Sequence, residues 1–276
     1  MTLFQAIIMG IIQGATEFLP VSSSGHMVLI THLLGWKKPS LFFSVMVHFA
    51  TLIAVMWAMS SDIKDLIKSF INLIRKNKEM QKDKSLDLLK SKIIWLLFVG
   101  TIPAAILGYL AHDFFEKLFG IPIYVVIALF ITGTLLFIEG WMRKTIDSLE
   151  LMKLKDAVLI GIAQAIAIVP GISRSAITTV MGRSRGLSRE NSLKFSFLLS
   201  VPIIFLATIY ETFRFFKETP SNFNITNTIF GMLFALITGF LSIKLLLNFF
   251  KRRKLRIFSL YCWALSIFSF IVIVIF

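Results

Sequence analysis

Six apolar stretches along the chain are each long enough to cross the hydrocarbon core of a bilayer as a helix. They occupy residues 41–60, 93–111, 121–141, 193–213, 229–250 and 257–276. Hydrophobic residues make up 57% of the 276 positions, and the 28 phenylalanines exceed what the core of a soluble protein needs. The pattern therefore predicts an all-α polytopic membrane protein with six full transmembrane helices.

Two further apolar regions, residues 1–36 and 157–182, are interrupted near their middle by proline, glycine and serine. The interruptions cover residues 20–25 and 170–175. Each half is too short to cross a bilayer, and irregular backbone at membrane depth is tolerated where it lines a polar cavity. We expect each region to form a re-entrant helix hairpin.

Positive charge is distributed unevenly over the connections between these segments. Most of the lysines and arginines, 21 of them, lie in residues 61–92, 142–156, 183–189 and 251–256. Only five lie in residues 36–40, 112–120 and 214–228. Cytoplasmic loops carry the excess of Lys and Arg, which assigns the first group to the cytoplasm. This orientation is consistent only if each interrupted region leaves the membrane on the side from which it entered. Residues 1–36 then enter from the outside, and residues 157–182 enter from the cytoplasm.

A weak internal repeat relates the two interrupted regions. Residues 10–13 (GIIQ) are echoed by residues 161–164 (GIAQ), and residues 20–23 (PVSS) by residues 170–173 (PGIS). Broken helices at corresponding places, entering from opposite faces, are typical of an inverted-topology repeat. The expected organisation is one integral membrane domain, residues 1–276, with repeats at about 1–141 and about 157–276.

The first interruption gathers side chains that can handle a phosphate group. Gln13 and Glu17 lie four residues apart and share one face of the first half-helix. The hydroxyl and imidazole groups that follow them are Ser22, Ser23, Ser24 and His26. The predicted start of a second half-helix at these serines offers free N–H groups and a positive dipole end to an anion. Polar groups are costly at membrane depth, which favours a functional site.

The second interruption supplies a guanidinium, Arg174, between two hydroxyls, Ser173 and Ser175. Arginine can bind phosphate through two parallel hydrogen bonds. If the two interruptions meet, Arg174 provides the charge of an anion site, with Ser23 or His26 as the nucleophile. Glu17 would act there as acid, base or metal ligand.

Structural explanations compete with these roles. A serine at a helix start is suited to capping, which applies to Ser22, Ser24 and Ser175. Arg174 could simply neutralise Glu17 as a buried pair. His26 could be a core histidine.

Polar residues outside the two interruptions have other expected roles. Three histidines that lack an acid or serine partner in a turn are expected to pack in the core or at interfaces: His32, His48 and His112. Glu139 and Glu211 lie near the ends of spans, and we expect them to reach toward water. The arginines after the second interruption are expected to determine topology: Arg183, Arg185 and Arg189.

Residues 17–26 (EFLPVSSSGH), preceded by Gln13, resemble the first signature of the bacterial undecaprenyl-diphosphatases of the bacitracin-resistance type. Residues 170–175 (PGISRS) resemble the second signature of that family. The similarity extends over the whole chain, including residues 195–202 (FSFLLSVP) and the basic turn before the last helix.

The resemblance implies hydrolysis of undecaprenyl diphosphate to undecaprenyl phosphate and inorganic phosphate. The site would face the extracytoplasmic side of the bacterial cytoplasmic (inner) membrane. This reaction recycles the lipid carrier of peptidoglycan synthesis and so serves cell-wall biogenesis and cell shape. It also opposes bacitracin, an antibiotic that sequesters the diphosphate.

By position, the resemblance assigns to the diphosphate site Glu17, Ser22, Ser23, His26, Ser173, Arg174 and Ser175. Gln13 stands where some members have glutamate, and the signature accepts either residue. Ser24 stands where threonine is frequent and keeps the hydroxyl. We also expect Gln13 and Ser24 to contact substrate. Mg²⁺ or Ca²⁺, held by Glu17 and the diphosphate, is the expected cofactor, without an organic one.

Two mechanisms and two functions remain open at this point. Ser23 attacks with His26 as general acid and base, or His26 itself accepts the phosphoryl group. The alternative function is a transporter or flippase of prenyl phosphates or another anion, since broken helices in inverted repeats also build transporters. A bare scaffold leaves the buried acid and arginine unexplained.

The expected partners are the polyprenyl diphosphate substrate and membrane lipids, with a homodimer left open. The net charge of +14 does not indicate nucleic acid, because the basic residues lie in loops between apolar spans. A basic groove with interleaved aromatic residues is absent from the sequence.

Overall fold

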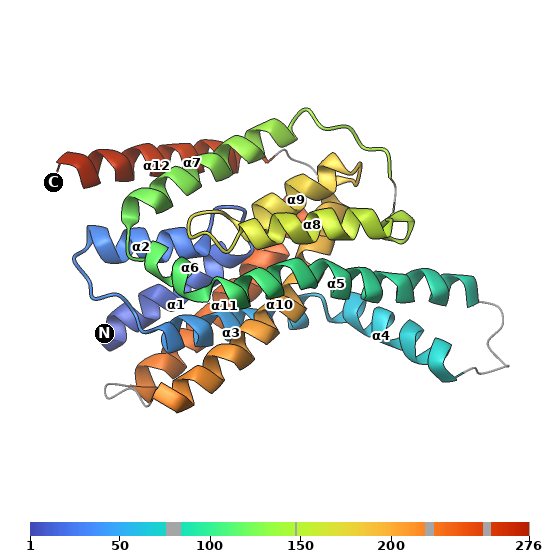
Figure 1. The fold of residues 1–276 in the computed structure, drawn as a ribbon, viewed down its shortest axis with the longest axis horizontal. Coiled ribbons are helices and arrows are strands. Elements are labelled where there is room, and N and C mark those ends of the chain that lie inside the picture. Colours follow the sequence, from blue (N-terminus) through green and yellow to red (C-terminus); the bar gives the residue numbers. More distant parts are fainter. Residues whose placement is uncertain (76–83, 147, 219–223, 251–254, 276) are drawn as a thin grey trace.

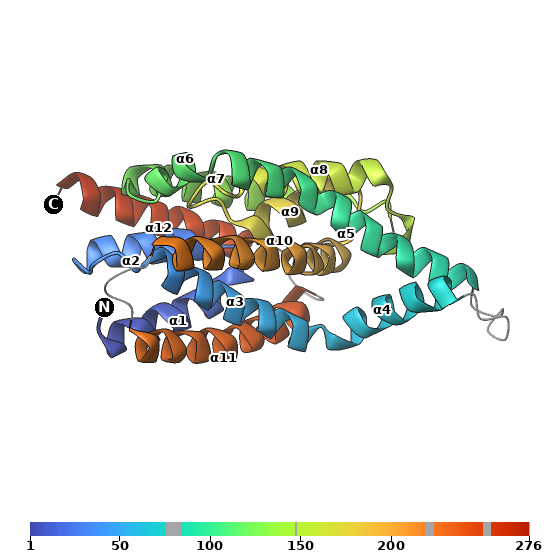
Figure 2. The ribbon, with the colours of Figure 1, turned by 60° about the horizontal axis from the view of Figure 1, so that its bottom comes forward.

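The computed structural model describes residues 1–75, 84–146, 148–218, 224–250 and 255–275, and this part of the chain is built from helices (Figure 1). The helices are α1 (Leu3–Glu17), α2 (Ser23–Leu33), α3 (Leu41–Ala58), α4 (Ser60–Arg75), α5 (Lys84–Leu110), α6 (His112–Leu118), α7 (Pro122–Glu139), η2 (Leu149–Leu151), α8 (Leu154–Ile166), α9 (Arg174–Ser184), α10 (Arg189–Glu218), α11 (Ile225–Phe250) and α12 (Arg256–Ile275). The long helices run along the molecule, and both termini lie at one end (Figures 1 and 2).

Length and composition of the described helices confirm a multi-pass membrane protein. Five helices, namely α5, α7, α10, α11 and α12, are long and apolar enough to cross a bilayer. A sixth candidate is α3 together with α4, and it is bent by 76°. The span expected at residues 41–60 therefore ends early, at Ala58, where the chain turns into α4.

The basic connection expected at residues 61–92 is helical over most of its described length. Helix α4 continues to Arg75, and α5 begins at Lys84, well before the predicted start of the apolar span at residue 93. Lys90 in this extension of α5 lies 3.4 Å from Asp65 of α4. Two basic stretches of the topology argument, residues 76–83 and 251–254, lie outside the described residues.

Each of the two interrupted regions forms a pair of half-helices joined by a turn inside the molecule (Figure 1). Helices α1 and α2 extend inward from the end that holds the termini, whereas α8 and α9 extend inward from the opposite end (Figures 1 and 2). The first turn contains Ser22 with φ 68° and the second contains Gly171 with φ 97°. Glycine adopts this left-handed conformation without steric cost, which explains its place after Pro170.

Close contacts between backbones hold the first half-helix of each pair against a long helix. A Cβ atom added at Gly10 would collide with the carbonyl group of Gly231 in α11. In the same way, a Cβ atom at Gly161 would collide with the carbonyl group of Gly100 in α5. Small residues allow such approaches between membrane helices, so the glycines set the positions of α1 and α8.

We expect Gly161→Ala to lower the free energy of unfolding by about 1–3 kcal/mol, because the methyl group meets a backbone carbonyl of α5. Gly108→Ala is the matched control, since the nearest atom to its added Cβ is Ile168 Cδ1 at 3.6 Å, an ordinary contact. Thermal unfolding in detergent measures both variants. Equal midpoints for the two variants would contradict the close approach of α8 and α5.

A buried carboxylate, Glu139, ties the end of α7 to α9 and α10. Its Oε1 accepts hydrogen bonds from Arg183 Nε at 2.7 Å and Arg189 Nε at 2.8 Å. Arg183 also donates to the backbone carbonyls of Leu187 and Met142. The expectation that Glu139 reaches toward water was wrong, because the side chain is fully buried and its charge is paired inside the protein.

Candidate active site

A serine caps the second half-helix of each pair. Ser22 Oγ accepts a hydrogen bond from the Gly25 N–H at 3.2 Å, and Ser173 Oγ accepts one from the Ala176 N–H at 3.2 Å. These caps satisfy backbone donors that have no partner in the first turn of a helix. The capping explanation is therefore confirmed for Ser22, and each cap fixes the direction in which α2 or α9 leaves its turn.

Hydrogen bonds connect the two turns directly. The Gly171 N–H donates to Ser24 Oγ at 3.4 Å, and Ser175 Oγ donates to the Leu19 carbonyl at 3.1 Å. Ser24 and Ser175 therefore join two segments that lie about 150 residues apart in the chain. Their hydroxyls hold the two turns together, a role distinct from capping.

Thr132 of α7 holds the second turn from another side. Its Oγ1 donates to the Gly171 carbonyl at 3.0 Å and accepts from the Ser173 N–H at 3.1 Å. Both bonds are buried, so they are protected from competition by water. Thr132 could not be predicted as part of the site, because a single threonine in an apolar span carries no distinguishing signal.

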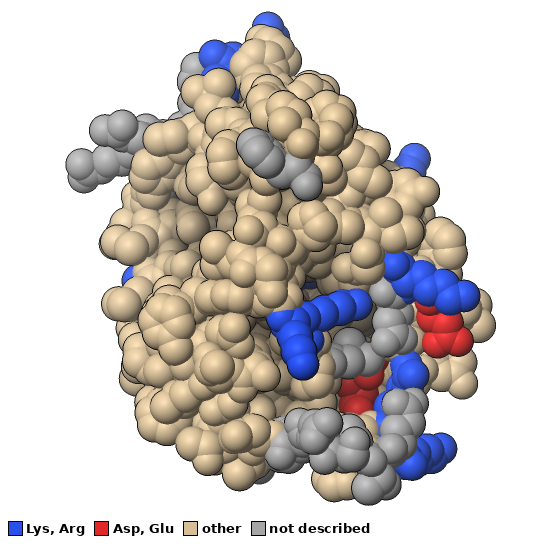
Figure 3. Space-filling view, turned by 90° about the vertical axis from the view of Figure 1, so that its left-hand side faces the viewer, with Lys and Arg blue, Asp and Glu red and all other residues tan. Residues whose placement is uncertain are grey.

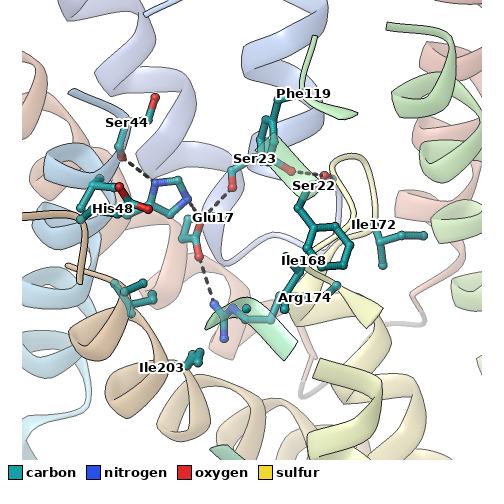
Figure 4. A pocket seen from close by; sticks show the side chains of 18 of the residues that line it. Glu17, Ser22, Ser23, Ser44, His48, Phe119, Ile168, Ile172, Arg174 and Ile203 are labelled. Atoms are coloured by element: carbon teal, nitrogen blue, oxygen red, sulfur yellow. Dashed lines mark hydrogen bonds and ion pairs between the residues drawn. The ribbon is translucent and has the colours of Figure 1, made fainter. Parts of the chain in front are cut away.

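Glu17, the last residue of α1, is the centre of the polar cluster. Its Oε2 accepts hydrogen bonds from Gln13 Nε2 at 2.8 Å and from Ser23 Oγ at 2.7 Å. The same oxygen lies 3.4 Å from His48 Nε2, and Oε1 lies 3.2 Å from Arg174 Nη2. Figure 4 shows His48, Ser23 and Arg174 on three sides of the carboxylate. The structure thus brings residues of α1, α2, α3 and α9 to one acid.

Arg174 starts α9 and is held by two contacts at different nitrogens. Nη2 donates to Glu17 Oε1 at 3.2 Å, and Nη1 donates to the Ser196 carbonyl of α10 at 3.2 Å. Its side chain is 14% exposed, so part of the guanidinium remains open to a ligand. A guanidinium held in this way can meet an oxyanion without first being ordered.

A cavity of about 540 Å³ opens at this cluster. Six of the predicted site residues line it: Glu17, Ser22, Ser23, Ser24, Ser173 and Arg174. Three others, which also belong to the described part of the chain, lie outside its lining: Gln13, His26 and Ser175. Gln13 and Ser175 act instead from behind the lining, through their bonds to Glu17 and Leu19.

The rest of the cavity wall is largely apolar. It includes Phe115, Phe119, Ile168, Ile172 and Ile203. Viewed toward the end that holds the termini, the surface is mostly uncharged, with basic side chains beside a hollow (Figure 3). The cavity therefore combines one polar end with walls suited to a hydrocarbon chain.

His26 points away from the acid and the arginine. Its Nδ1 lies 2.7 Å from the Ser22 carbonyl, and its Nε2 lies 2.7 Å from the Tyr261 hydroxyl of α12. The rings of His26 and Tyr261 stack with their centroids 5.7 Å apart. The predicted partnership of Ser23 with His26 is not formed in this structure, where Ser23 Oγ bonds to Glu17 instead.

The histidine beside the central carboxylate is His48 and not His26. It lines the cavity and lies beside Glu17, although we expected it to be a packing residue. The signal that could have identified it is the spacing of Ser44 and His48, one helical turn apart on one face of an apolar span. Such a polar face in a membrane helix indicates contact with a polar interior.

A second acid–base pair lines the cavity. His112 Nε2 lies 2.6 Å from Glu211 Oε1. This contact joins the start of α6 to α10. The expectation that Glu211 reaches toward water was therefore wrong. Lys38 lines the same cavity from the connection between α2 and α3.

The donor set limits how a divalent cation could be held. Among the described residues, no group of three His, Cys, Asp or Glu side chains has the arrangement of a metal site. Within the described part of the chain, Glu17 is the carboxylate of this cluster, and its Oε1 accepts a hydrogen bond from Arg174. This set fits a cation such as Mg²⁺ that takes one ligand from the protein and the others from substrate phosphates and water. It does not fit a cation coordinated entirely by protein side chains.

The chain is similar to known proteins over nearly its whole length. The family model described as "Bacitracin resistance protein BacA" matches residues 6–268. A protein of Methanobrevibacter smithii named undecaprenyl-diphosphatase is 39% identical over 98% of this chain and 97% of its own length. An undecaprenyl-diphosphatase of Alkaliphilus metalliredigens is 38% identical over 96% of this chain and 97% of its own length. An undecaprenyl-diphosphatase of Halothermothrix orenii is 36% identical over 97% of this chain and 96% of its own length. The chain belongs to the BacA family of bacitracin resistance proteins.

Proposed function

We propose that this protein hydrolyses undecaprenyl diphosphate to undecaprenyl phosphate and inorganic phosphate. The names of its relatives support this reaction. The observation that carries the proposal is a cavity in which Ser23, Glu17 and Arg174 meet at one end of apolar walls. The diphosphate head binds at the polar end, and the first isoprene units lie along the apolar wall.

Ser23 is the proposed nucleophile, and Glu17 is the base that takes its proton. The 2.7 Å bond from Ser23 Oγ to Glu17 Oε2 supports this pairing, because a base must reach the proton that it removes. Ser23 Oγ bonds to the terminal phosphorus as the bridging P–O bond breaks, and undecaprenyl phosphate leaves. Water then attacks the same phosphorus, Ser23 recovers its proton from Glu17, and inorganic phosphate is released.

Arg174 stabilises the charge that spreads over the transferred phosphoryl oxygens. Its guanidinium is fixed by the Ser196 carbonyl before substrate binds, so little reorganisation is needed in the transition state. The starts of α2 and α9 line the same cavity, and the positive end of each helix dipole favours an anion there. Catalysis therefore depends on positioning and charge.

The proposed membrane arrangement has six spans and two re-entrant hairpins, α1–α2 and α8–α9, related as inverted repeats. The matching glycine contacts of α1 on α11 and of α8 on α5 support the repeat. The positive-inside rule supports a cytoplasmic location for residues 142–156 and 183–189. The cavity then opens on the extracytoplasmic side of the bacterial cytoplasmic membrane, where the lipid carrier of peptidoglycan synthesis is recycled and bacitracin acts.

The proposed cofactor is Mg²⁺ or Ca²⁺, shared between the protein and the diphosphate. Glu17 would hold it, and the ion would neutralise part of the charge on the phosphate oxygens. The remaining roles in the proposed reaction belong to side chains of the protein. Arg174 binds the terminal phosphate, and Glu17 orients the Ser23 hydroxyl through their hydrogen bond.

Phosphate release from a prenyl diphosphate by the purified protein in detergent tests the function. We expect release with Mg²⁺ or Ca²⁺, a fall of at least about tenfold after EDTA treatment, and recovery when the cation is restored. The same protein in liposomes tests the alternative function. Absence of hydrolysis, together with movement of prenyl phosphate across the bilayer, would replace the hydrolase by a transporter.

A further inference from the structure

Lys38 is a basic side chain of the cavity wall, and its charge has no carboxylate beside it. The other charged pair at the polar end, Glu17 and Arg174, is joined at 3.2 Å. A second carboxylate of the wall, Glu211, lies 2.6 Å from His112. Within the described part of the chain, the Lys38 ammonium forms neither an ion pair nor a hydrogen bond. Its positive charge is therefore available to an anionic ligand.

Local features of residues 34–40, the connection between α2 and α3, hold the backbone around Lys38. The Trp36 N–H is bonded back to α2 at 2.8 Å. Pro39 disfavours helical backbone at the residue before it, which keeps Lys38 out of α3. The Ser40 side chain then caps the start of α3. The connection is thus fixed on both sides of Lys38, whose ammonium reaches the cavity on a flexible stem.

Lys38 lies on the side of the cavity that borders the serines. A smaller hollow of about 220 Å³ adjoins the cavity, and six residues line both: Ser24, Lys38, Pro39, Ser44, His48 and Phe119. Ser24 bonds to the second turn and His48 lies 3.4 Å from Glu17, so this shared wall borders the polar cluster. Lys38 Nζ lies 6.0 Å from the centre of the Phe119 ring, at the outer limit of a cation–π contact. Lys38 therefore stands between the polar cluster and the apolar wall.

The order of chemical groups along a prenyl diphosphate matches the order along this wall. In the proposed reaction the terminal phosphate meets Ser23 and Arg174, and the isoprene chain contacts apolar residues such as Phe119. The proximal phosphate, which is bonded to the chain, lies between them. A diphosphate carries negative charge on both phosphates, whereas Glu17 already compensates the charge of Arg174. A second cation beside the proximal phosphate therefore favours binding, and Lys38 supplies it.

We propose that Lys38 binds the proximal phosphate, the one that stays with the lipid. This inference rests on the proposed function and adds a specificity-determining residue to it. When the bridging P–O bond breaks, the electron pair stays on the oxygen of the departing prenyl phosphate. The Lys38 ammonium compensates that charge and keeps its own proton. The two cations thus divide the two products, since Arg174 contacts the inorganic phosphate and Lys38 contacts the lipid phosphate.

The test compares Lys38→Gln with Lys37→Gln in the intact protein in detergent. Both variants remove one positive charge from neighbouring exposed positions, but Lys37 lies outside the lining of both cavities. We expect kcat/KM for farnesyl diphosphate to fall about tenfold in Lys38→Gln and by less than about twofold in Lys37→Gln. Equal losses in the two variants would reduce Lys38 to a contribution to surface charge and overturn the proposal.

Inhibition by the two products separates the two phosphate positions. Farnesyl monophosphate keeps only the proximal phosphate, and inorganic phosphate corresponds to the terminal one. In Lys38→Gln we expect the inhibition constant of farnesyl monophosphate to rise about tenfold and that of inorganic phosphate to stay within about twofold of wild type. A merely structural role raises both constants together. Such a joint rise, or an unchanged constant for farnesyl monophosphate, contradicts the proposal.

Calorimetric binding of farnesyl monophosphate measures the contact without any hydrolysis. Lys38→Arg keeps the charge at a similar reach, so we expect an affinity within about threefold of wild type. A loss as large as that in Lys38→Gln would exclude charge as the cause and refute the proposal. If wild type releases no phosphate, the hydrolase function fails, although weaker binding in Lys38→Gln alone still supports Lys38 as a ligand of the lipid phosphate. Active wild type with equally tight binding in Lys38→Gln rejects Lys38 alone.

Discussion

Arg174→Ala is expected to reduce kcat/KM for a prenyl diphosphate by about a thousandfold or more. The guanidinium is the cation that contacts the central carboxylate from the second turn, and arginines at phosphoryl groups contribute about 10³–10⁵ in rate. Its removal also leaves Glu17 Oε1 without the guanidinium that contacts it, which weakens the contact between the two turns. Phosphate release at several substrate concentrations measures the effect.

Arg174→Lys separates charge from geometry. Lysine keeps the positive charge but cannot reach the Ser196 carbonyl and a phosphate with one planar group, so we expect only partial recovery of kcat. Thermal unfolding in detergent shows whether the alanine variant remains folded. A folded Arg174→Ala protein that retains a tenth of the wild-type kcat/KM would exclude Arg174 as the phosphate-binding cation.

Ser23→Ala is expected to abolish the phosphoserine intermediate and to lower kcat by roughly three orders of magnitude. The reason is the 2.7 Å bond to Glu17, which orients the hydroxyl and prepares its deprotonation. Rapid quenching of the reaction with a prenyl diphosphate ³²P-labelled in the terminal phosphate tests for the covalent intermediate.

Ser24→Ala is the matched comparison for Ser23→Ala. Its hydroxyl also lines the cavity but bonds to the Gly171 N–H of the second turn, so we expect a much smaller loss of kcat. Labelled phosphate on His26 in place of Ser23 would establish the rival mechanism, in which the histidine accepts the phosphoryl group. Equal kcat values for wild type and Ser23→Ala would exclude Ser23 as the nucleophile.

Local signals in the chain were sufficient to locate most of the cluster. Acidic, hydroxyl and guanidinium groups at Glu17, Ser23 and Arg174 interrupt long apolar segments, and polar groups at such depth are costly. The helix breaks were predictable for the same reason, since proline and glycine disrupt backbone hydrogen bonding at residues 20–25 and 170–175. The two interrupted segments could be matched with each other because the weak sequence repeat places each at the corresponding position of its half of the chain.

The assignment of the histidines could not be predicted in this way. His26 lies in the signature segment, but α2 turns its ring toward Tyr261, a residue 235 positions later in the chain. His48 lies in an apolar span without a motif, and the packing of α3 against α1 brings it to Glu17. Which partner an imidazole meets depends on helix rotation, and the spacing of residues along one helix does not set that rotation relative to another.

The partners of the buried carboxylates could not be predicted from the sequence either. Glu139 and Glu211 lie near helix ends, where sequence position suggested contact with water, yet Glu139 pairs with Arg183 and Glu211 pairs with His112. A carboxylate can be buried only where a partner compensates the loss of hydration. That partner comes from another helix, so the pairing becomes visible only in the folded protein.

The sequence alone determined that this is a helical membrane protein with two broken apolar segments and an acid, serines and an arginine at the breaks. Those conclusions follow from transfer costs and helix propensities, which act over a few residues. Only the tertiary structure decided that Ser23 bonds to Glu17 and that His48 lines the cavity while His26 does not. Hydrogen bonds require a specific distance and direction between helices, and the packing of the whole chain sets both.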